Sequence, residues 1–179
     1  MDKKEVSFLL LRYLILLILG ISNLFLFYFI FTPLTVYPTF WVLKYLYGAV
    51  LYSGNVIFFK GYFASIIPAC IAGAAYYLLL ILNLTTPMEI KKRTKSIIFL
   101  LGTFLILNLV RILIFAMLLF KGYQYFDLAH TATWYFGSTA LVIVIWFGNV
   151  LIFKIKEIPI YSDLKNIYQD IKNNKSNKS

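Results

Sequence analysis

The chain has 179 residues, of which 61% are hydrophobic and only 13% are charged, and its formal net charge is +10. A soluble domain carries about 25% charged residues, so this composition predicts a single-domain integral membrane protein with no room for a separate soluble domain. The positive charges are clustered, which argues against nucleic acid as a partner and for orientation signals or contacts with lipid headgroups.

Several common site chemistries are excluded by counting. One cysteine excludes an intramolecular disulfide, and one histidine with seven scattered carboxylates excludes most metal sites. The chain also contains no GxSxG, no HExxH and no glycine-rich phosphate loop. We therefore predict neither a metal nor a cofactor.

Apolar runs long enough to cross a bilayer set the expected fold. A membrane helix needs about 20 apolar residues, and the first run is longer than the apolar region of a cleavable signal, which is about 7–15 residues. We predict an all-α integral membrane protein, with one polytopic domain over 1–159 and a basic cytoplasmic tail over 160–179. Its four main transmembrane helices are expected at about 8–31, 66–84, 97–120 and 130–153.

The distribution of positive charge predicts the orientation of these spans. The 85–96 loop is rich in lysine and arginine, and the chain from Lys154 onward has six lysines against three acidic residues. Because cytoplasmic loops carry an excess of Lys and Arg, both segments are expected in the cytoplasm. Four spans then place the N-terminus there too, together with Lys3 and Lys4.

The 36–60 segment is apolar enough to suggest a fifth span. A fifth span would put the 85–96 loop and the tail on the side opposite Lys3 and Lys4, unless the N-terminus also changed sides. Its aromatic residues, such as Tyr37 and Trp41, are also typical of the membrane–water interface. We therefore expect an interfacial or re-entrant segment on the outer face, with a strand-like VIFF at 56–59, that roofs a cavity and limits water.

Three polar residues stand out in apolar sequence: Cys70, Arg111 and His130. An ionisable residue inside a span is costly and marks a functional site by default. With the orientation above, all three lie in the outer half of the bilayer, and Arg111, nine residues before Phe120, is about 13 Å deep. A thiol, a guanidinium and an imidazole can together serve as nucleophile, oxyanion stabiliser and general base.

Local sequence refines the first two roles. Pro68 suits the first turn of a helix, so Cys70 is expected near the positive end of a helix dipole, which favours a thiolate. The alternative is a small, buried, apolar cysteine. Asn108 precedes Arg111 by one helical turn on the same face, so the pair can present an amide and a guanidinium fork to one carbonyl or carboxylate. The structural alternative is that Arg111 snorkels or bonds helix carbonyls.

His130 opens the predicted fourth span, three residues after Asp127. Asp127 can cap this helix or orient the imidazole, and the sequence leaves both roles open. An isolated interfacial histidine is more often structural than catalytic, so the general acid and base role of His130 rests on the presence of Cys70 and Arg111.

Taken in order, these features resemble the exosortase/archaeosortase family. The resemblance rests on Pro68-Ala69-Cys70, on the N-x-x-R-I run that begins at Asn108, and on the histidine that opens the last span, and it covers the core from about Gly54 to Phe153. Bacterial exosortases typically follow the cysteine with Ser-Gly. Here Cys70 is followed by Ile71-Ala72-Gly73, which is more similar to the archaeal branch.

The resemblance implies a cysteine transpeptidase of the cell membrane with its active site on the outer face. Its partners would be exported surface proteins that carry a C-terminal recognition motif, an apolar span and a basic cluster, together with a membrane lipid as acceptor. Cys70 would attack the peptide bond, Arg111 would hold the oxyanion or position the substrate, and His130 would act as acid and base. Asn108 and Asp127 are the predicted substrate-binding residues. The substrate's span would dock near Ala69 and Gly73, or near 137–140.

Two other functions remain open at this stage. A small transporter or channel subunit would use Arg111 to bind an anion in the membrane and would tolerate Cys70→Ala. A structural scaffold that recruits partners through its tail would lose only stability on replacement of the three polar residues.

Overall fold

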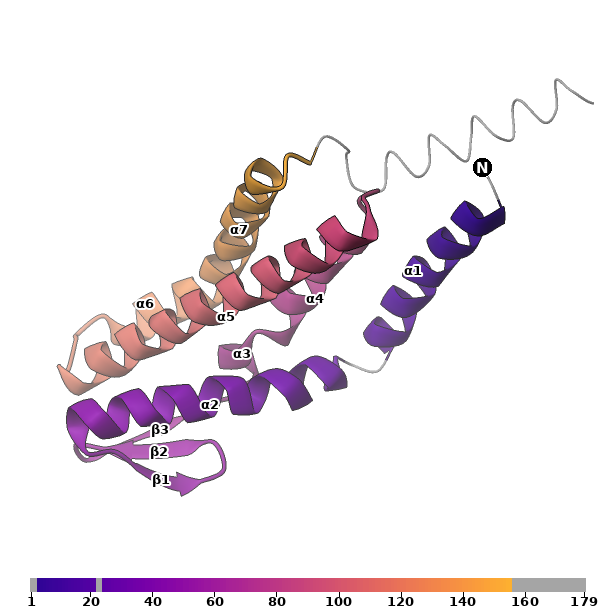
Figure 1. Cartoon of the computed structure of the whole chain (residues 1–179). Helices are drawn as coiled ribbons and strands as arrows, with labels where there is room; N and C mark the ends of the chain where they lie inside the picture. The colour runs from indigo at the N-terminus through magenta and orange to yellow at the C-terminus, as the bar shows by residue number, and fades with distance from the viewer. Residues whose placement is uncertain (1–2, 22–23, 156–179) are drawn as a thin grey trace, which may run out of the picture.

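The computed structural model describes residues 3–21 and 24–155, and most of them are helical (Figure 1). Three helices in this part of the chain are long and apolar enough to cross a membrane: α2 (Phe25–Tyr47), α5 (Ile90–Phe120) and the continuous stretch Phe126–Ile152. Two shorter apolar helices cover Leu9–Ile21 and Pro68–Leu84. The expectation of a helical chain suited to a membrane is confirmed, whereas the predicted tail at 160–179 lies outside the described residues.

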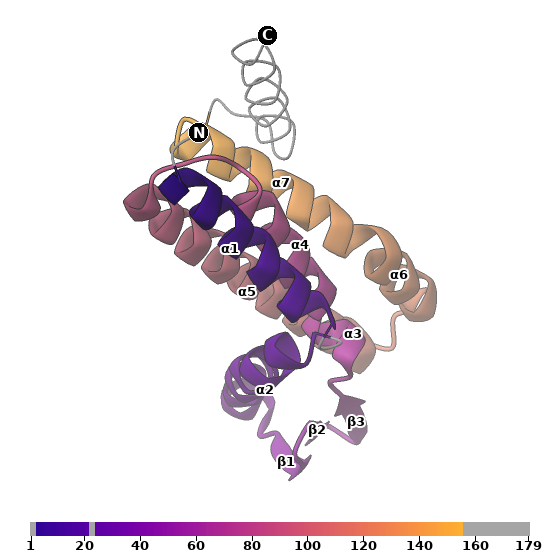
Figure 2. The same cartoon turned by 90° about the vertical axis from the view of Figure 1, so that its right-hand side faces the viewer.

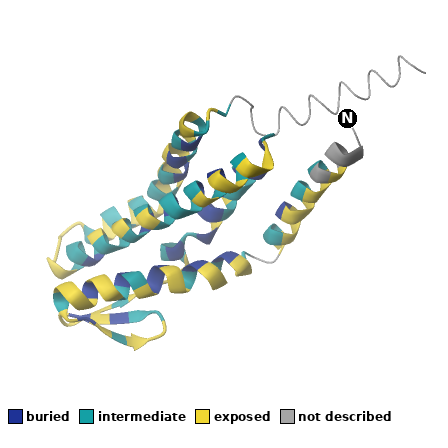
Figure 3. Ribbon diagram, viewed as in Figure 1, coloured by how far each residue is buried: buried dark blue, intermediate teal, exposed yellow. Residues whose placement is uncertain are grey.

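The outer faces of the helices are apolar. Large side chains such as Leu17, Phe29, Ile106 and Val144 are mostly exposed on the outer faces of the bundle, and exposed residues follow the helices along their length (Figure 3). A soluble monomer rarely exposes apolar patches of this extent, so these faces are suited to contact lipid chains.

The predicted span at 8–31 is two helices rather than one. Helix α1 (Lys3–Ile21) ends before Leu24, whose left-handed backbone (φ 58°) precedes the start of α2. A residue with a left-handed backbone conformation interrupts a right-handed helix, and for a residue other than glycine this conformation is unusual. Hydropathy alone missed this break because only Ser22 and Asn23 interrupt the apolar run.

Helix α2 runs on through Pro33 and Pro38 to Tyr47. Proline inside a helix removes a hydrogen bond, but membrane helices tolerate it where neighbouring groups compensate. The first part of the predicted 36–60 segment is therefore the second half of α2, which lies alongside the second half of α5.

The rest of that segment forms a small antiparallel sheet, which departs from the all-α expectation. Strands β1 (Val50–Ser53), β2 (Val56–Phe59) and β3 (Tyr62–Ser65) lie in that order, and the strand predicted at 56–59 is confirmed as β2. Lys60 and Gly61 both have positive φ between the paired Phe59 and Tyr62, as a two-residue hairpin turn requires.

The predicted span at 66–84 is also interrupted. A single turn, α3 (Pro68–Ile71), ends at Ala72, which is left-handed (φ 59°), and α4 (Gly73–Leu84) begins directly after it. Asn108 on α5 is fully buried, and its Nδ2 donates hydrogen bonds to the carbonyls of Cys70 (2.9 Å) and Ile71 (3.5 Å). The amide therefore satisfies carbonyls that the helix break leaves free.

The last helical stretch consists of α6 (Phe126–Ala132), a π-helical turn η1 (Thr133–Gly137) and α7 (Ser138–Ile152). The start of α1, the connection from α4 to α5 and the end of α7 lie at one end of the molecule, and the sheet lies at the other (Figures 1 and 2). Helix α5 begins at Ile90, so much of the predicted 85–96 loop is helical. Lys92 Nζ in the first turn of α5 donates to the Lys154 carbonyl at 3.4 Å, so basic residues of this turn and of the chain after α7 meet at the end opposite the sheet.

A buried polar chain joins α4, α5 and α7 near that basic end. Asn83 Nδ2 donates to Ser96 Oγ (2.6 Å), Ser96 Oγ donates to Asn149 Oδ1 (2.8 Å), and all three side chains are inaccessible to solvent. Polar residues between helices hold membrane bundles together where the hydrophobic effect cannot.

We expect Ser96→Ala to lower the free energy of unfolding by about 1–3 kcal/mol, because it leaves two buried amides without their shared partner. Denaturant unfolding in detergent micelles measures this change. Thr94→Ala is the matched control, since the Thr94 hydroxyl is exposed and bonds only its own helix, at the Ile90 carbonyl. Equal losses in the two variants would show that the buried chain adds nothing to stability.

Candidate active site

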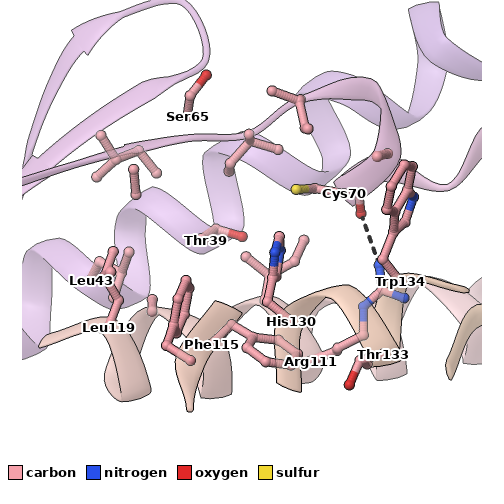
Figure 4. A pocket seen from close by; sticks show the side chains of 18 of the residues that line it. Thr39, Leu43, Ser65, Cys70, Arg111, Phe115, Leu119, His130, Thr133 and Trp134 are labelled. Atoms are coloured by element: carbon pink, nitrogen blue, oxygen red, sulfur yellow. Dashed lines mark hydrogen bonds between the residues drawn. The ribbon is translucent and has the colours of Figure 1, made fainter. Parts of the chain in front are cut away.

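A cavity of about 440 Å³ lies between α2, the sheet, α3, α5 and the α6–η1 stretch. Cys70, Arg111 and His130 all line it, and Figure 4 shows their side chains around the same space. The structure thus brings together the three polar residues singled out in the sequence. The second half of α2 (Thr39, Leu43) and the strands (Ile57, Phe63) line the same cavity.

Cys70 reaches the cavity from the single turn α3. It is half-buried and is the third residue of a four-residue helix, with Pro68 in the first turn as predicted. Because α3 ends at Ala72, its dipole is far smaller than that of a long helix. The local positive charge at Cys70 therefore comes mainly from the Arg111 guanidinium.

Arg111 is half-buried and is held by neutral groups. Its Nη1 donates to Ser138 Oγ at 2.6 Å, and its Nη2 donates to the Cys70 carbonyl at 3.5 Å. The second distance is at the limit for a hydrogen bond. Within the described residues no carboxylate lies within ion-pair distance of this guanidinium, so its charge remains available to an anion or a developing oxyanion in the cavity.

Asn108 and Arg111 were expected to present their donors to a carbonyl or carboxylate of the substrate, whereas in the structure both donate to the backbone carbonyl of Cys70. Asn108 is not among the residues that line the cavity. It lies behind α3, where it fixes the backbone that carries the thiol, so in this structure it is a positioning residue for Cys70.

His130 projects into the cavity from α6, and Figure 4 shows its imidazole pointing toward the side where Cys70 lies. Its ring stacks on Phe126 (centroids 5.5 Å apart, 7° between planes) and meets Phe115 edge-on at 5.2 Å. The two phenylalanines fix the ring plane, and its nitrogens make no hydrogen bond to any described residue. Both nitrogens are therefore free for proton transfer with a bound substrate.

Asp127 takes neither role that the sequence left open. The helix N-cap position is Tyr125 without a side-chain cap bond, and the exposed Asp127 bonds neither His130 nor any other described residue. It also lies outside the residues that line the cavity, so its predicted contact with substrate has no counterpart in this geometry.

Sequence reasoning gave Ser138 and Trp134 no role beside Arg111. Ser138 accepts its shortest hydrogen bond, and Trp134 lines the same cavity as Arg111, where Figure 4 labels both. Tyr76 on α4 is fully buried, and its ring stacks on Phe31 at a centroid distance of 3.6 Å. Its hydroxyl has no partner in the described residues, and it lies close enough to Arg111 to interact electrostatically.

Comparisons of the chain with protein-family models, with curated proteins and with solved structures found no match.

Proposed function

We propose that this chain is a membrane-embedded cysteine transpeptidase of the archaeosortase type, which cleaves the C-terminal sorting signal of exported surface proteins and transfers them to a lipid acceptor. The observation that carries the proposal is that the only cysteine of the sequence, its only histidine and Arg111, which has no ion-pair partner among the described residues, line one cavity. Thiol, imidazole and guanidinium are the groups that thioester chemistry needs.

In the proposed first step, His130 takes the Cys70 proton while the sulfur attacks the scissile carbonyl and a C–S bond forms. The guanidinium N–H groups that Ser138 and Cys70 leave unused stabilise the oxyanion. The intermediate collapses, the C–N bond breaks, and His130 returns its proton to the leaving amine. The product is a thioester between Cys70 and the mature part of the substrate.

In the second step, an amine or hydroxyl of a lipid headgroup attacks the thioester. His130 takes the proton of this acceptor as the new bond forms, and it returns that proton to the departing Cys70 sulfur. The second half of α2 and the sheet would cover the cavity, limit water and so favour transfer over hydrolysis. The basic residues gathered at the opposite end support a cavity that faces outward, under the positive-inside rule.

Trapping of the acyl-enzyme tests the proposal. The protein is expressed in membranes together with an exported protein that is encoded by a neighbouring gene and ends in a recognition motif, an apolar span and a basic cluster. The intact mass of the proposed enzyme is then measured with and without hydroxylamine. We expect an adduct that contains substrate sequence up to one cleavage point, disappears with hydroxylamine and is absent from Cys70→Ala. Substrate processing that continues in Cys70→Ala without any adduct would overturn the proposal.

The second candidate is a small transporter or channel subunit, favoured by a guanidinium that faces the cavity with no carboxylate partner in the part of the chain that the structure describes. Here Arg111 would bind an anionic solute rather than an oxyanion. Anion flux into proteoliposomes separates the two functions, because a transporter keeps its flux in Cys70→Ala and loses it in Arg111→Gln.

A further inference from the structure

The π-helical turn Thr133–Gly137 lies between two residues of the site, His130 and Ser138. In a regular helix, residues eight positions apart differ by about 80° around the axis, whereas residues seven apart nearly share a face. A π turn accommodates one additional residue. His130 and Ser138 therefore face the same side of this stretch, as residues seven apart do in an unbroken helix.

Local contacts show why the turn can form here. A Cβ on Gly137 would lie 2.7 Å from Thr133 Cγ2, so glycine leaves room for the threonine methyl inside the turn. π turns of this kind occur frequently at functional sites. Here the turn carries Trp134, which lines the cavity, and it ends directly before Ser138.

Ser138 supplies the shorter of the two hydrogen bonds that hold Arg111, at 2.6 Å against 3.5 Å to the Cys70 carbonyl. The Cys70 carbonyl already accepts a good bond from Asn108 at 2.9 Å, so it does not depend on Arg111. Without the serine hydroxyl, a long side chain with about 2 kcal/mol of rotamer entropy would keep only its weakest contact. The anchor of the guanidinium is therefore Ser138.

We propose that Ser138 is a positioning residue, placed by the π turn Thr133–Gly137, that holds the Arg111 guanidinium beside Cys70 opposite His130. For catalysis this inference rests on the proposed function. The position of the guanidinium, however, can be measured without any substrate.

Cys70 is the only cysteine, so alkylation in membranes or micelles reports on this site alone. The probe is the ratio of its reaction rates with iodoacetate and with iodoacetamide. Iodoacetate is an anion and iodoacetamide is neutral, but the two reagents are similar in size. Differences in access to the thiol and in its reactivity therefore cancel in the ratio of the two rates. The ratio reports how strongly nearby charge attracts an anion. Among the described residues, the other titratable side chains that line the cavity with Cys70 are Arg111 from α5 and His130 from α6. Tyr76 from α4 interacts electrostatically with Arg111.

We expect Ser138→Ala to lower this ratio about threefold, toward the value for Arg111→Gln. Ser138→Thr keeps the hydroxyl and should restore the ratio. Thr139→Ala, which removes the neighbouring exposed hydroxyl, should leave it unchanged. A ratio in Ser138→Ala equal to or above that of the unmodified protein would overturn the inference. Acyl-enzyme trapping is a separate measurement, so failure of the proposed function and failure of this inference are distinguishable.

Discussion

Replacement of Cys70 by alanine or serine is expected to reduce substrate processing by about 10³-fold or more, the effect of removing a covalent nucleophile. Serine is the more informative change, because it differs from cysteine by one atom and fits the half-buried site on α3. Its hydroxyl ionises far less readily than a thiol. No carboxylate among the described residues bonds His130 to strengthen it as a base, so the geometry favours a thiol.

The measurement is the rate at which the substrate protein is cleaved in membranes, which is monitored over time through its change in mass. Unfolding in micelles serves as the control. We expect the serine variant to match the unmodified protein there, because Cys70 makes its hydrogen bonds to other described residues only through its backbone. Processing by the serine variant at an unchanged rate would rule out thioester chemistry at this position.

The parts of the site predicted from sequence are those that depend on rare residues. Arg111 and His130 are ionisable residues that apolar helices tolerate poorly, and Cys70 stood out as the only cysteine of the chain. The one-turn spacing of Asn108 and Arg111 also predicted that the two side chains lie on one helix face, because i and i+3 do so regardless of the fold. Such inferences need only local geometry.

The parts that were not predicted depend on tertiary packing. Leu24 and Ala72 have left-handed backbones but are not glycines. The sequence therefore lacks the glycine that usually indicates such a break, and the two predicted spans were not divided there. At Ala72 the break is compensated by Asn108, which lies 36 positions further along the chain. Hydropathy averaged over a window of residues cannot detect a break that depends on one residue and its distant partner.

The three-stranded sheet and the contact of Ser138 with Arg111 were not predicted for similar reasons. The strands have four residues each and an aromatic composition that also suits an interfacial helix, so only the β-branched start of β2 indicated a strand. Ser138 lies eight residues after His130, a spacing that predicts different faces in a regular helix. Only the π turn brings the two onto one face.

Replacement of Arg111 by lysine should lower processing by about 10²–10³-fold, the cost of removing one oxyanion donor. The guanidinium donates in two directions at once, to Ser138 Oγ and to the Cys70 carbonyl, and still has N–H groups for substrate. An ammonium is a point charge that lacks this planar fork. Its three N–H groups diverge from a single nitrogen, so they do not reproduce the planar alignment of donors that the guanidinium offers to an oxyanion.

Measurements of turnover and of the amount of acyl-enzyme distinguish a directional oxyanion donor at position 111 from a positive charge without that geometry. In Arg111→Lys we expect slow formation of the Cys70 thioester while the iodoacetate to iodoacetamide ratio stays above that of Arg111→Gln, because lysine keeps the positive charge. Rapid processing by the lysine variant would leave charge as the only contribution of Arg111 and would remove its role as a directional oxyanion donor. Loss of anion flux in Arg111→Lys with normal flux in Cys70→Ala would instead support the transporter, because only that function uses the arginine without the thiol.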